Sequence, residues 1–316
     1  MQIIKLSQLQ NRNQLLEIWN EEYGKIYPIT KELFDRNTDS LDEDISAVAV
    51  DNDKVIGFIL IKIWKYPFII ESYLNAAWIN LLYVIPKMRK HGIGTILLNQ
   101  AEEELKKIGK NVLNLGRDYH NFFPGLPIDF DNFLPWFKKR GFEFTYQTHD
   151  LIRNCQNKEK LRIENQDFTF RIATLNDKES LISFIKRLWP GRWEMETIEY
   201  FNNGGDGSEY VICLNNKNEI CGFAKFNKPT TDISLISYSR TWYGRFDKLG
   251  GIGPLGIDPE NRHHHLGYDI VSSAVNYLLD LNVSDIIIDW TGLLEFYRHM
   301  DFEVWKAYSY SSKKLI

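Results

Sequence analysis

Two short loops that combine glycine with basic residues are the features of this sequence best suited to chemistry. Residues 89–94 read Arg-Lys-His-Gly-Ile-Gly, and residues 262–267 read Arg-His-His-His-Leu-Gly. The first amides of a helix have no intrahelical acceptor and lie at the positive end of its dipole, and glycine lets an anion approach the backbone closely. A loop of this kind at the start of a helix predicts a phosphate-binding site.

The residues on either side of the first loop supply the elements that such a site needs. An apolar run at 79–84 predicts a strand, which Pro86 ends, and apolar positions from Ile93 to Ile108 recur with helical spacing. The alternative interpretation is a tight turn between strand and helix that binds no ligand. The flanking elements and the second copy of the loop together favour a phosphate ligand.

The second half of the chain repeats the landmarks of the first half in the same order. WFKKRGF at 136–142 is matched by FYRHMDF at 296–302, and the loop 119–131 accounts for about thirteen residues that only the first copy carries. A polar segment at 153–167 separates the two copies. We therefore predict an N-terminal domain at 1–152, a linker at 153–167 and a C-terminal domain at 168–316.

Composition excludes several classes of protein. The 316 residues are 44% hydrophobic and 25% charged, with a formal charge of -4, which argues against nucleic acid or a membrane as a partner. The most apolar run, 55–64, is too short to cross a bilayer, and no signal-peptide core is found near the N-terminus. With three cysteines we expect a cytoplasmic protein without a disulfide framework. Oligomeric state is left open.

A metal site is not expected either. Three consecutive histidines, 263–265, cannot converge on one ion, and no carboxylate or cysteine cluster accompanies them.

The pattern Val84-x-Pro86-x-x-Arg89-x-x-Gly92-x-Gly94, with the aromatic-x-x-x-Gly-Phe of 137–142, resembles the acetyl-coenzyme A loop of the GNAT N-acetyltransferases. The second copy resembles another such domain. The resemblance implies two tandem α/β domains, each with a mixed, mainly antiparallel sheet splayed between its fourth and fifth strands, and acetyl-coenzyme A in the splay. A Rossmann dinucleotide site would need Gly-x-Gly-x-x-Gly and a later acid, which neither copy offers.

The implied cofactor contacts fall on equivalent positions of the two copies. They are Leu82, Val84, Arg89, Lys90, His91, Gly92, Ile93 and Gly94 in the first copy, and Gly256, Ile257, Arg262, His263, His264, His265, Leu266 and Gly267 in the second.

Residues for acid and base chemistry are found only in the second copy. In the family, a tyrosine four residues before the Gly-Phe pair protonates the departing thiolate; the resemblance assigns this role to Tyr297, where the first copy has Phe137. Asp289 follows the strand predicted at 285–288, whose three isoleucines form an apolar run. Partial burial there would raise the pKa of Asp289 and make it a better base for the amine. The alternatives are a core aromatic for Tyr297 and a helix cap for Asp289.

Aromatic residues around the second site suggest the acceptor. Trp193, Tyr243 and Trp290 are suited to a sugar ring that carries an amine. The chain is also similar to tandem GNAT glucosamine or glucosaminide N-acetyltransferases. We expect N-acetylation of a small primary amine, an amino sugar first. Transfer to a peptide or protein N-terminus, or to another small amine, and a non-catalytic acyl-coenzyme A sensor are the alternatives.

Overall fold

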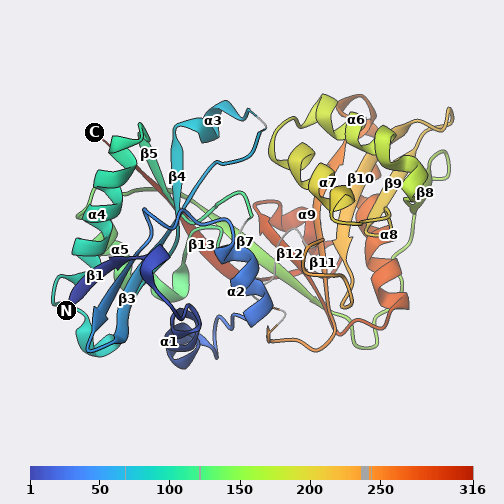
Figure 1. Ribbon diagram of the computed structural model, residues 1–316. Coiled ribbons are helices and arrows are strands. Elements are labelled where there is room, and N and C mark those ends of the chain that lie inside the picture. The colour runs from blue at the N-terminus through green and yellow to red at the C-terminus, as the bar shows by residue number, and fades with distance from the viewer. Residues whose placement is uncertain (68, 121, 236–241, 243, 316) are drawn as a thin grey trace. The chain divides into compact units, whose positions relative to one another are not determined.

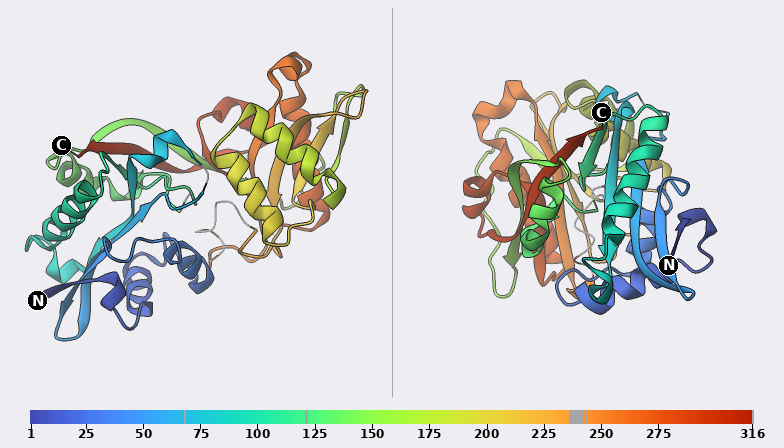
Figure 2. Two further views of the ribbon diagram at one scale, coloured as in Figure 1. Left: turned by 45° about the horizontal axis from the view of Figure 1, so that its top comes forward. Right: turned by 90° about the vertical axis from the view of Figure 1, so that its left-hand side faces the viewer.

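The computed structural model describes residues 1–67, 69–120, 122–235, 242 and 244–315 (Figures 1 and 2). Contacts divide the chain into two compact units. The first unit consists of 1–148 and 307–316, and the second of 149–306. In each unit, parallel and antiparallel strand pairs form a mixed arrangement with helices packed on it.

The first unit begins with strand β1 (Gln2–Lys5) and continues through helices and strands to the first part of β7. Its sheet has the order β1-β2-β3-β4-β5-β13. The elements after β1 are α1 (Asn13–Tyr23), α2 (Lys31–Thr38), β2 (Ala47–Asp51), β3 (Lys54–Ile63), α3 (Glu71–Leu74), β4 (Ala76–Val84), α4 (Ile93–Lys107), β5 (Val112–Leu115), β6 (Leu126–Pro127), α5 (Leu134–Lys138) and β7 (Glu143–Asn154). The long helix α4 packs along the sheet, as Figure 2 shows.

The second unit repeats this order of elements. Its sheet has the order β7-β12-β11-β10-β9-β8. The elements are β8 (Thr169–Ile172), α6 (Lys178–Leu188), α7 (Arg192–Asn202), β9 (Tyr210–Leu214), β10 (Ile220–Asn227), β11 (Leu249–Ile257), α8 (Leu266–Asp280), β12 (Asp285–Thr291), α9 (Leu294–Arg298) and β13 (Glu303–Lys314).

Each sheet contains one parallel pair of strands that separates part-way along. In the first unit, β4 pairs with β5 only from Ala76 to Ile79, although β4 continues to Val84. In the second unit, β11 pairs with β12 only from Leu249 to Ile252, although β11 continues to Ile257. The remaining pairs of the two sheets are antiparallel. The predicted splay between the fourth and fifth strands is therefore confirmed in both units.

Strands are exchanged between the two halves of the sequence. Residues 311–314 of β13 pair with β5 in the first unit, whereas residues 149–154 of β7 pair with β12 in the second. The predicted linker, 153–167, does not coincide with this division, since Arg153 and Asn154 belong to β7. The rest of the segment is held along α8, where Asn276 forms two hydrogen bonds with the backbone of Leu161 (2.7 and 2.8 Å).

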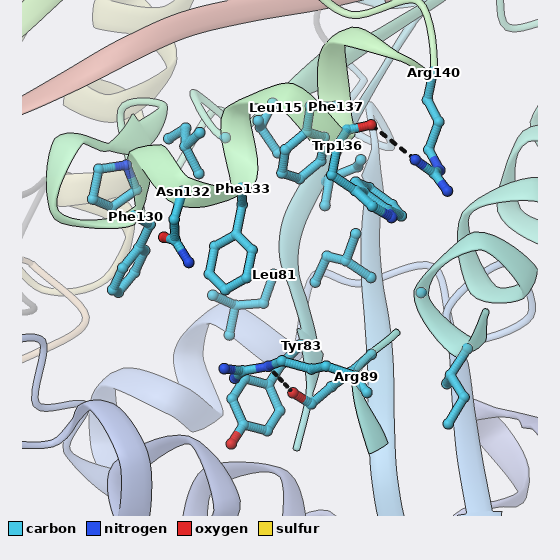
Figure 3. A pocket seen from close by; sticks show the side chains of 18 of the residues that line it. Leu81, Tyr83, Arg89, Leu115, Phe130, Asn132, Phe133, Trp136, Phe137 and Arg140 are labelled. Carbon is cyan, nitrogen blue, oxygen red and sulfur yellow. Dashed lines mark hydrogen bonds between the residues drawn. The ribbon is translucent and has the colours of Figure 1, made fainter. Parts of the chain in front are cut away.

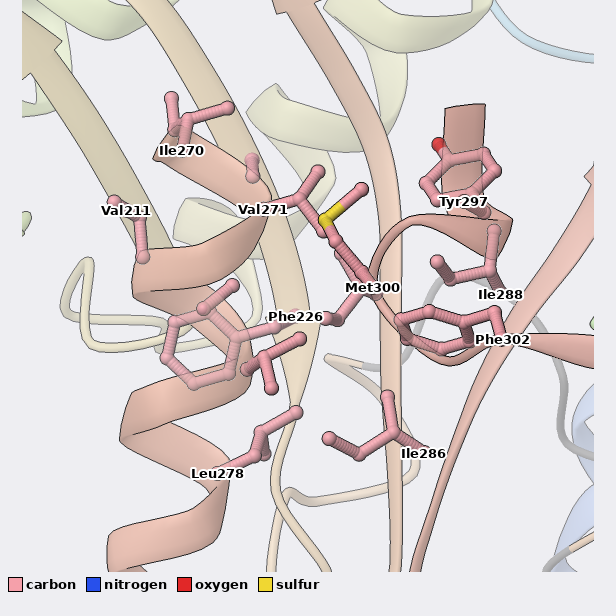
Figure 4. Packing of buried hydrophobic residues seen from close by; sticks show 14 of the residues in the cluster. Val211, Phe226, Ile270, Val271, Leu278, Ile286, Ile288, Tyr297, Met300 and Phe302 are labelled. Atoms are coloured by element: carbon pink, nitrogen blue, oxygen red, sulfur yellow. The ribbon is translucent and has the colours of Figure 1, made fainter. Parts of the chain in front are cut away.

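The core of the second unit lies between α8 and the sheet. Ile270, Ala274 and Leu278 recur every fourth residue of α8, so they share one face of the helix and pack on strand residues such as Phe226 and Ile286 (Figure 4). Tyr297 lies at the edge of this cluster. None of the helices in the described ranges has the length and hydropathy that crossing a membrane requires.

Candidate functional site

A cavity of about 660 Å³ opens in the splay of the first unit (Figure 3). This volume is typical of a site for a small molecule or cofactor. The walls come from α1, the separated part of β4, the loop before α4, the end of β5, the segment 123–133 and α5. They include Trp19, Tyr23, Asn80, Leu81, Tyr83, Arg89, Lys90, Gly92, Gly94, Thr95, Leu115, Phe123, Leu126, Phe130, Phe133, Trp136, Phe137 and Arg140.

The loop before α4 has the conformation expected of an anion site. Lys90 and Gly92 both have positive φ, +65° and +83°, which turn the chain into the helix. No atom would lie within 4 Å of a Cβ at Gly92, so the approach to the backbone is open there. A Cβ at Gly94 would lie 3.4 Å from the Trp136 ring, so the second glycine leaves room at the wall of the cavity. The free amides at the start of α4 are thus accessible to a phosphate.

The side chain of Arg89 braces this loop. Its Nε donates to the carbonyl oxygen of Val84 (2.8 Å), and its Nη2 donates to Glu22 (2.5 Å) and to the Tyr23 hydroxyl (3.2 Å). Tyr83 also donates to Glu22 (2.7 Å). Burial raises the pKa of Tyr23 to about 12, and burial with the hydrogen bond to Glu22 raises that of Tyr83, so both phenols keep their protons at neutral pH. Arg89 therefore fixes the end of β4 relative to α1.

Arg140 is a further cation at the cavity, and it was not identified from the sequence. Its guanidinium stacks on Trp136 (3.8 Å to the ring centroid) and donates to Thr95 Oγ1 (2.5 Å) and to the Trp136 carbonyl (2.9 Å). Its Nε is buried without a partner in the described structure. The sequence offered one signal for it: in WFKKRGF the fifth residue is Arg140, whereas the second copy has Met300 at the equivalent position. Arg140 thus has an unsatisfied donor beside the first turn of α4.

Asn80 was also missed, and it provides an unsatisfied acceptor. It lies on β4 where the strands separate, and its Nδ2 donates to Asp118 Oδ2 (3.0 Å). Asp118 in turn pairs with Lys62 (2.9 Å), both side chains being fully buried. Asn80 Oδ1 is buried and has no hydrogen-bond partner within the described ranges. Because such groups are normally paired, this oxygen points to a ligand donor.

Charge distinguishes the two loops. The cavity of the first unit is lined by Arg89, Lys90 and Arg140, and none of the lining residues that the structure describes is an aspartate, glutamate or histidine. The equivalent stretch of the second unit, 258–269, contains Asp258, Glu260 and Asp269 against one arginine. An anionic ligand is therefore favoured electrostatically in the first unit.

The loop of the second unit keeps the backbone conformation without the glycine. His265 occupies the left-handed region (φ +58°) that Gly92 occupies in the first copy, and Arg262 Nε donates to the Ile257 carbonyl (3.4 Å) as Arg89 does to Val84. A Cβ at Gly256 would lie 2.5 Å from the Trp189 ring, so this ring covers the separated part of β11. The side chain of His263 lies outside the described structure.

The predicted acid and base lie around the end of β12. Tyr297 is 3% exposed, and burial followed by the negative charge of Asp289 raises its pKa, so the phenol is protonated at neutral pH. Asp289 and Trp290 are half-buried. Trp290 has a φ of +48°, which is rare for a bulky residue, and its amide donates to Asp150 (3.2 Å).

The predicted aromatic residues are only partly brought together. Trp193 packs against Trp189 with ring centroids 5.4 Å apart, and the guanidinium of Arg192, the residue before it, lies 4.6 Å from the Trp290 ring centroid. Tyr243 lies outside the described residues.

Sequence comparison identifies the first unit. Residues 12–123 match the model of the acetyltransferase (GNAT) family, and this range contains α1, the separated strand β4 and the glycine loop. The chain contains a GNAT acetyltransferase domain. No curated protein matches the sequence.

Solved structures show the GNAT fold over the whole chain. A glucosamine N-acetyltransferase region of a fungal multi-domain GH3 β-N-acetylglucosaminidase is 21% identical, with a TM-score of 0.86; the match covers 98% of this chain but 38% of that protein. A GCN5-related N-acetyltransferase from Sphaerobacter thermophilus is 14% identical, with a TM-score of 0.69; the match covers 96% of this chain and 91% of that chain. A tandem GNAT protein of clavulanic acid biosynthesis is 12% identical, with a TM-score of 0.69; the match covers 99% of this chain and 98% of that chain. Both units thus have the GNAT fold.

In the part of the chain that the structure describes, no group of three histidine, cysteine or acidic side chains could hold a metal ion.

Proposed function

We propose that this protein transfers the acetyl group of acetyl-coenzyme A to the primary amine of a small acceptor in the second GNAT domain, and that the cavity of the first GNAT domain also holds a molecule of coenzyme A. The observation that carries the cofactor site is the cavity of about 660 Å³ between the separated strands, at the glycine loop. Two unsatisfied polar groups, Arg140 Nε and Asn80 Oδ1, lie at it.

These groups fit the chemistry of coenzyme A. The amides at the start of α4 and the guanidinium of Arg140 would hold phosphate oxygens. Asn80 Oδ1 would accept a hydrogen bond from an amide N–H of the pantetheine arm. When bound, acetyl-coenzyme A supplies the thioester carbonyl that the amine attacks.

For the proton transfers we propose Asp289 as base and Tyr297 as acid, acting on acetyl-coenzyme A bound at the second domain's own loop, 262–267. The cavity of the first domain is then a separate site for coenzyme A. A protonated amine must lose a proton before it attacks, and a carboxylate at the end of β12 suits that role. Tyr297 keeps its proton at neutral pH and so has one to donate to the departing thiolate.

For the acceptor we propose an amino sugar, glucosamine or a glucosaminide. Arg192 stacks on Trp290, and Trp193, the next residue in sequence, packs on Trp189. Aromatic faces beside polar groups suit a sugar ring. The fungal region of similar fold is a glucosamine N-acetyltransferase. Peptides and other small amines are the competing acceptors.

Release of free thiol from acetyl-coenzyme A tests the proposal. Glucosamine, chitobiose-type glucosaminides, N-terminal peptides, polyamines and aminoglycosides are compared, and N-acetylated product is identified by mass. We expect the largest kcat/KM with an amino sugar. A preference for long peptides would overturn the acceptor assignment, and thiol release no faster than hydrolysis with every acceptor would overturn transfer itself.

Charge reversal of one arginine in each domain shows which domain binds coenzyme A more tightly. We expect Arg140→Glu to weaken coenzyme A binding strongly, and Arg262→Glu to have a smaller effect on binding measured by calorimetry. The reverse order would place the tighter coenzyme A site in the second domain.

A second candidate function is a first domain that binds acyl-coenzyme A without transferring the acyl group. The observation that favours it is that Phe137 replaces the tyrosine and that, within the described ranges, no acid or histidine lines this cavity. Binding of acetyl-coenzyme A with no transfer to any acceptor would support this candidate over the first.

A further inference from the structure

The end of the first-domain cavity that lies away from Arg140 is apolar. Figure 3 shows Phe130 and Arg140 toward opposite sides of the labelled residues. Trp19, Phe123, Leu126 and Phe130 all line the cavity and are each at most 8% exposed. Asn132 also lies near this end, and Arg89 lies 5.4 Å from the Phe133 centroid, where it is already paired with Glu22. The cavity therefore extends from Arg140 to a wall made mainly of apolar side chains.

This apolar wall is built largely by the residues that only the first domain carries. The segment 119–133 supplies Phe123, Leu126 and Phe130, while the second domain has only a short connection between β12 and α9. The segment is firmly attached, since β6 pairs with β13 and the Tyr27 hydroxyl donates to Asp129 (2.8 Å).

The wall is also packed tightly on α1. Phe130 lies 4.5 Å from Tyr23, and Phe123 lies 5.8 Å from Trp19, measured between ring centroids. These four aromatic rings pack on one another in pairs, and they set the shape of the apolar end.

The chemistry of the lining restricts what this end can hold. Among the described residues the lining contains no acid, and Glu22 beside it is already bonded to Arg89 and Tyr83. A protonated amine buried among these aromatic rings would therefore lack an acid to pair with, which is costly. An alkyl chain is favoured at such a wall because each buried methylene gains about 0.8 kcal/mol. The end is continuous with the cavity proposed for coenzyme A, so the chain would be attached to that ligand.

We propose that the first domain binds coenzyme A thioesters whose acyl chain is longer than acetyl, with the chain against Phe123, Leu126 and Phe130. This inference rests on the proposed cofactor site. It adds a chain-length preference that the GNAT loop alone does not define.

Calorimetry of the full chain with free, acetyl-, butyryl- and hexanoyl-coenzyme A tests the inference. We expect affinity to rise about fourfold for each added methylene until the apolar end is filled. Arg140→Glu should abolish this preference because it removes the first-domain site. Equal affinity for all four ligands would overturn the inference while leaving the cofactor site intact, whereas no binding of free or acetyl-coenzyme A would overturn the cofactor site itself.

A bulkier residue in the wall separates chain binding from other effects. Leu126→Trp fills the apolar end, and we expect it to lower the ratio of hexanoyl- to acetyl-coenzyme A affinity at least tenfold. Ile128→Trp is the matched control, because Ile128 belongs to the same segment, is 36% exposed and does not line the cavity. If Leu126→Trp folds incorrectly by circular dichroism, Leu126→Phe makes the same test with less added volume. An unchanged ratio in a folded variant, or displacement of coenzyme A ligands by apolar amines, would contradict an acyl occupant.

Discussion

Arg140→Met gives the first domain the residue that the second domain has at the equivalent position. The substitution removes the stack on Trp136, the hydrogen bond to Thr95 and the unsatisfied Nε beside α4. Burial lowers the pKa of Arg140, which indicates that the guanidinium is partly removed from water in the free protein and gains from an anionic partner.

The loss of cofactor affinity follows from the type of contact. A hydrogen bond to a charged group contributes about 1.5–3 kcal/mol. Because Arg140 is half-buried, solvent screening reduces this to about 1–2 kcal/mol, which corresponds to a dissociation constant for coenzyme A raised about 5- to 30-fold. Calorimetry at low and high salt measures this dissociation constant. The difference in coenzyme A affinity between variant and wild type should shrink at high salt, because salt screens the phosphates.

Lys139→Met is the matched control, since it removes one positive charge at an exposed neighbour outside the cavity. We expect its effect on the dissociation constant to be less than twofold. Equal losses in the two variants would show that net charge alone is responsible, and an unchanged dissociation constant in Arg140→Met would refute the placement of phosphate beside α4.

The remaining predictions concern chemistry, backbone conformation and acid stability. Tyr297→Phe should lower kcat about 10- to 10,000-fold with little change in coenzyme A affinity, and Asp289→Asn should remove most activity and alter the acidic limb of the pH profile, measured by thiol release; normal turnover in both would contradict their roles. Gly116→Ala should destabilise the first domain by about 2 kcal/mol or more in urea denaturation, because φ is +67° and a Cβ would clash with backbone 2.5 Å away; wild-type stability would contradict this. Arg171 hydrogen bonds lower the pKa of Asp177 to about 2, so the stability they contribute is present above about pH 4 and is lost as pH falls toward 2. Arg171→Met should therefore cost about 1 kcal/mol at pH 7, and this difference should shrink below pH 4; a constant difference would contradict the linkage.

The sequence predicted the features that local patterns encode. The repeated loops and their flanking apolar runs placed β4 with α4 and β11 with α8, and the resemblance to the GNAT family implied the splay that both sheets show. The extra residues of the first copy were also located from spacing alone.

The exchange of strands could not be predicted in this way. β7 and β13 have the same length, twelve residues each, and either could pair with β5 or β12 on pattern alone. Which partner a strand takes depends on contacts between residues far apart in the chain.

Arg140 and Asn80 were missed for a different reason. A single arginine or asparagine is common in any sequence, and its role follows from an unpaired atom at a cavity that only three-dimensional structure defines. Likewise, nothing in the spacing indicated that Trp189 covers Gly256.

The strand exchange has a consequence for the order in which the protein folds during synthesis. Domains usually fold as the ribosome releases them, the N-terminal one first. Here β5 lacks its antiparallel neighbour until residues 311–314 have left the ribosome, whereas 149–154 are available before any other strand of the second sheet. We therefore expect nascent chains that stop before residue 307 to present an unpaired edge at β5 and to depend on chaperones, even when all of 1–148 has been made.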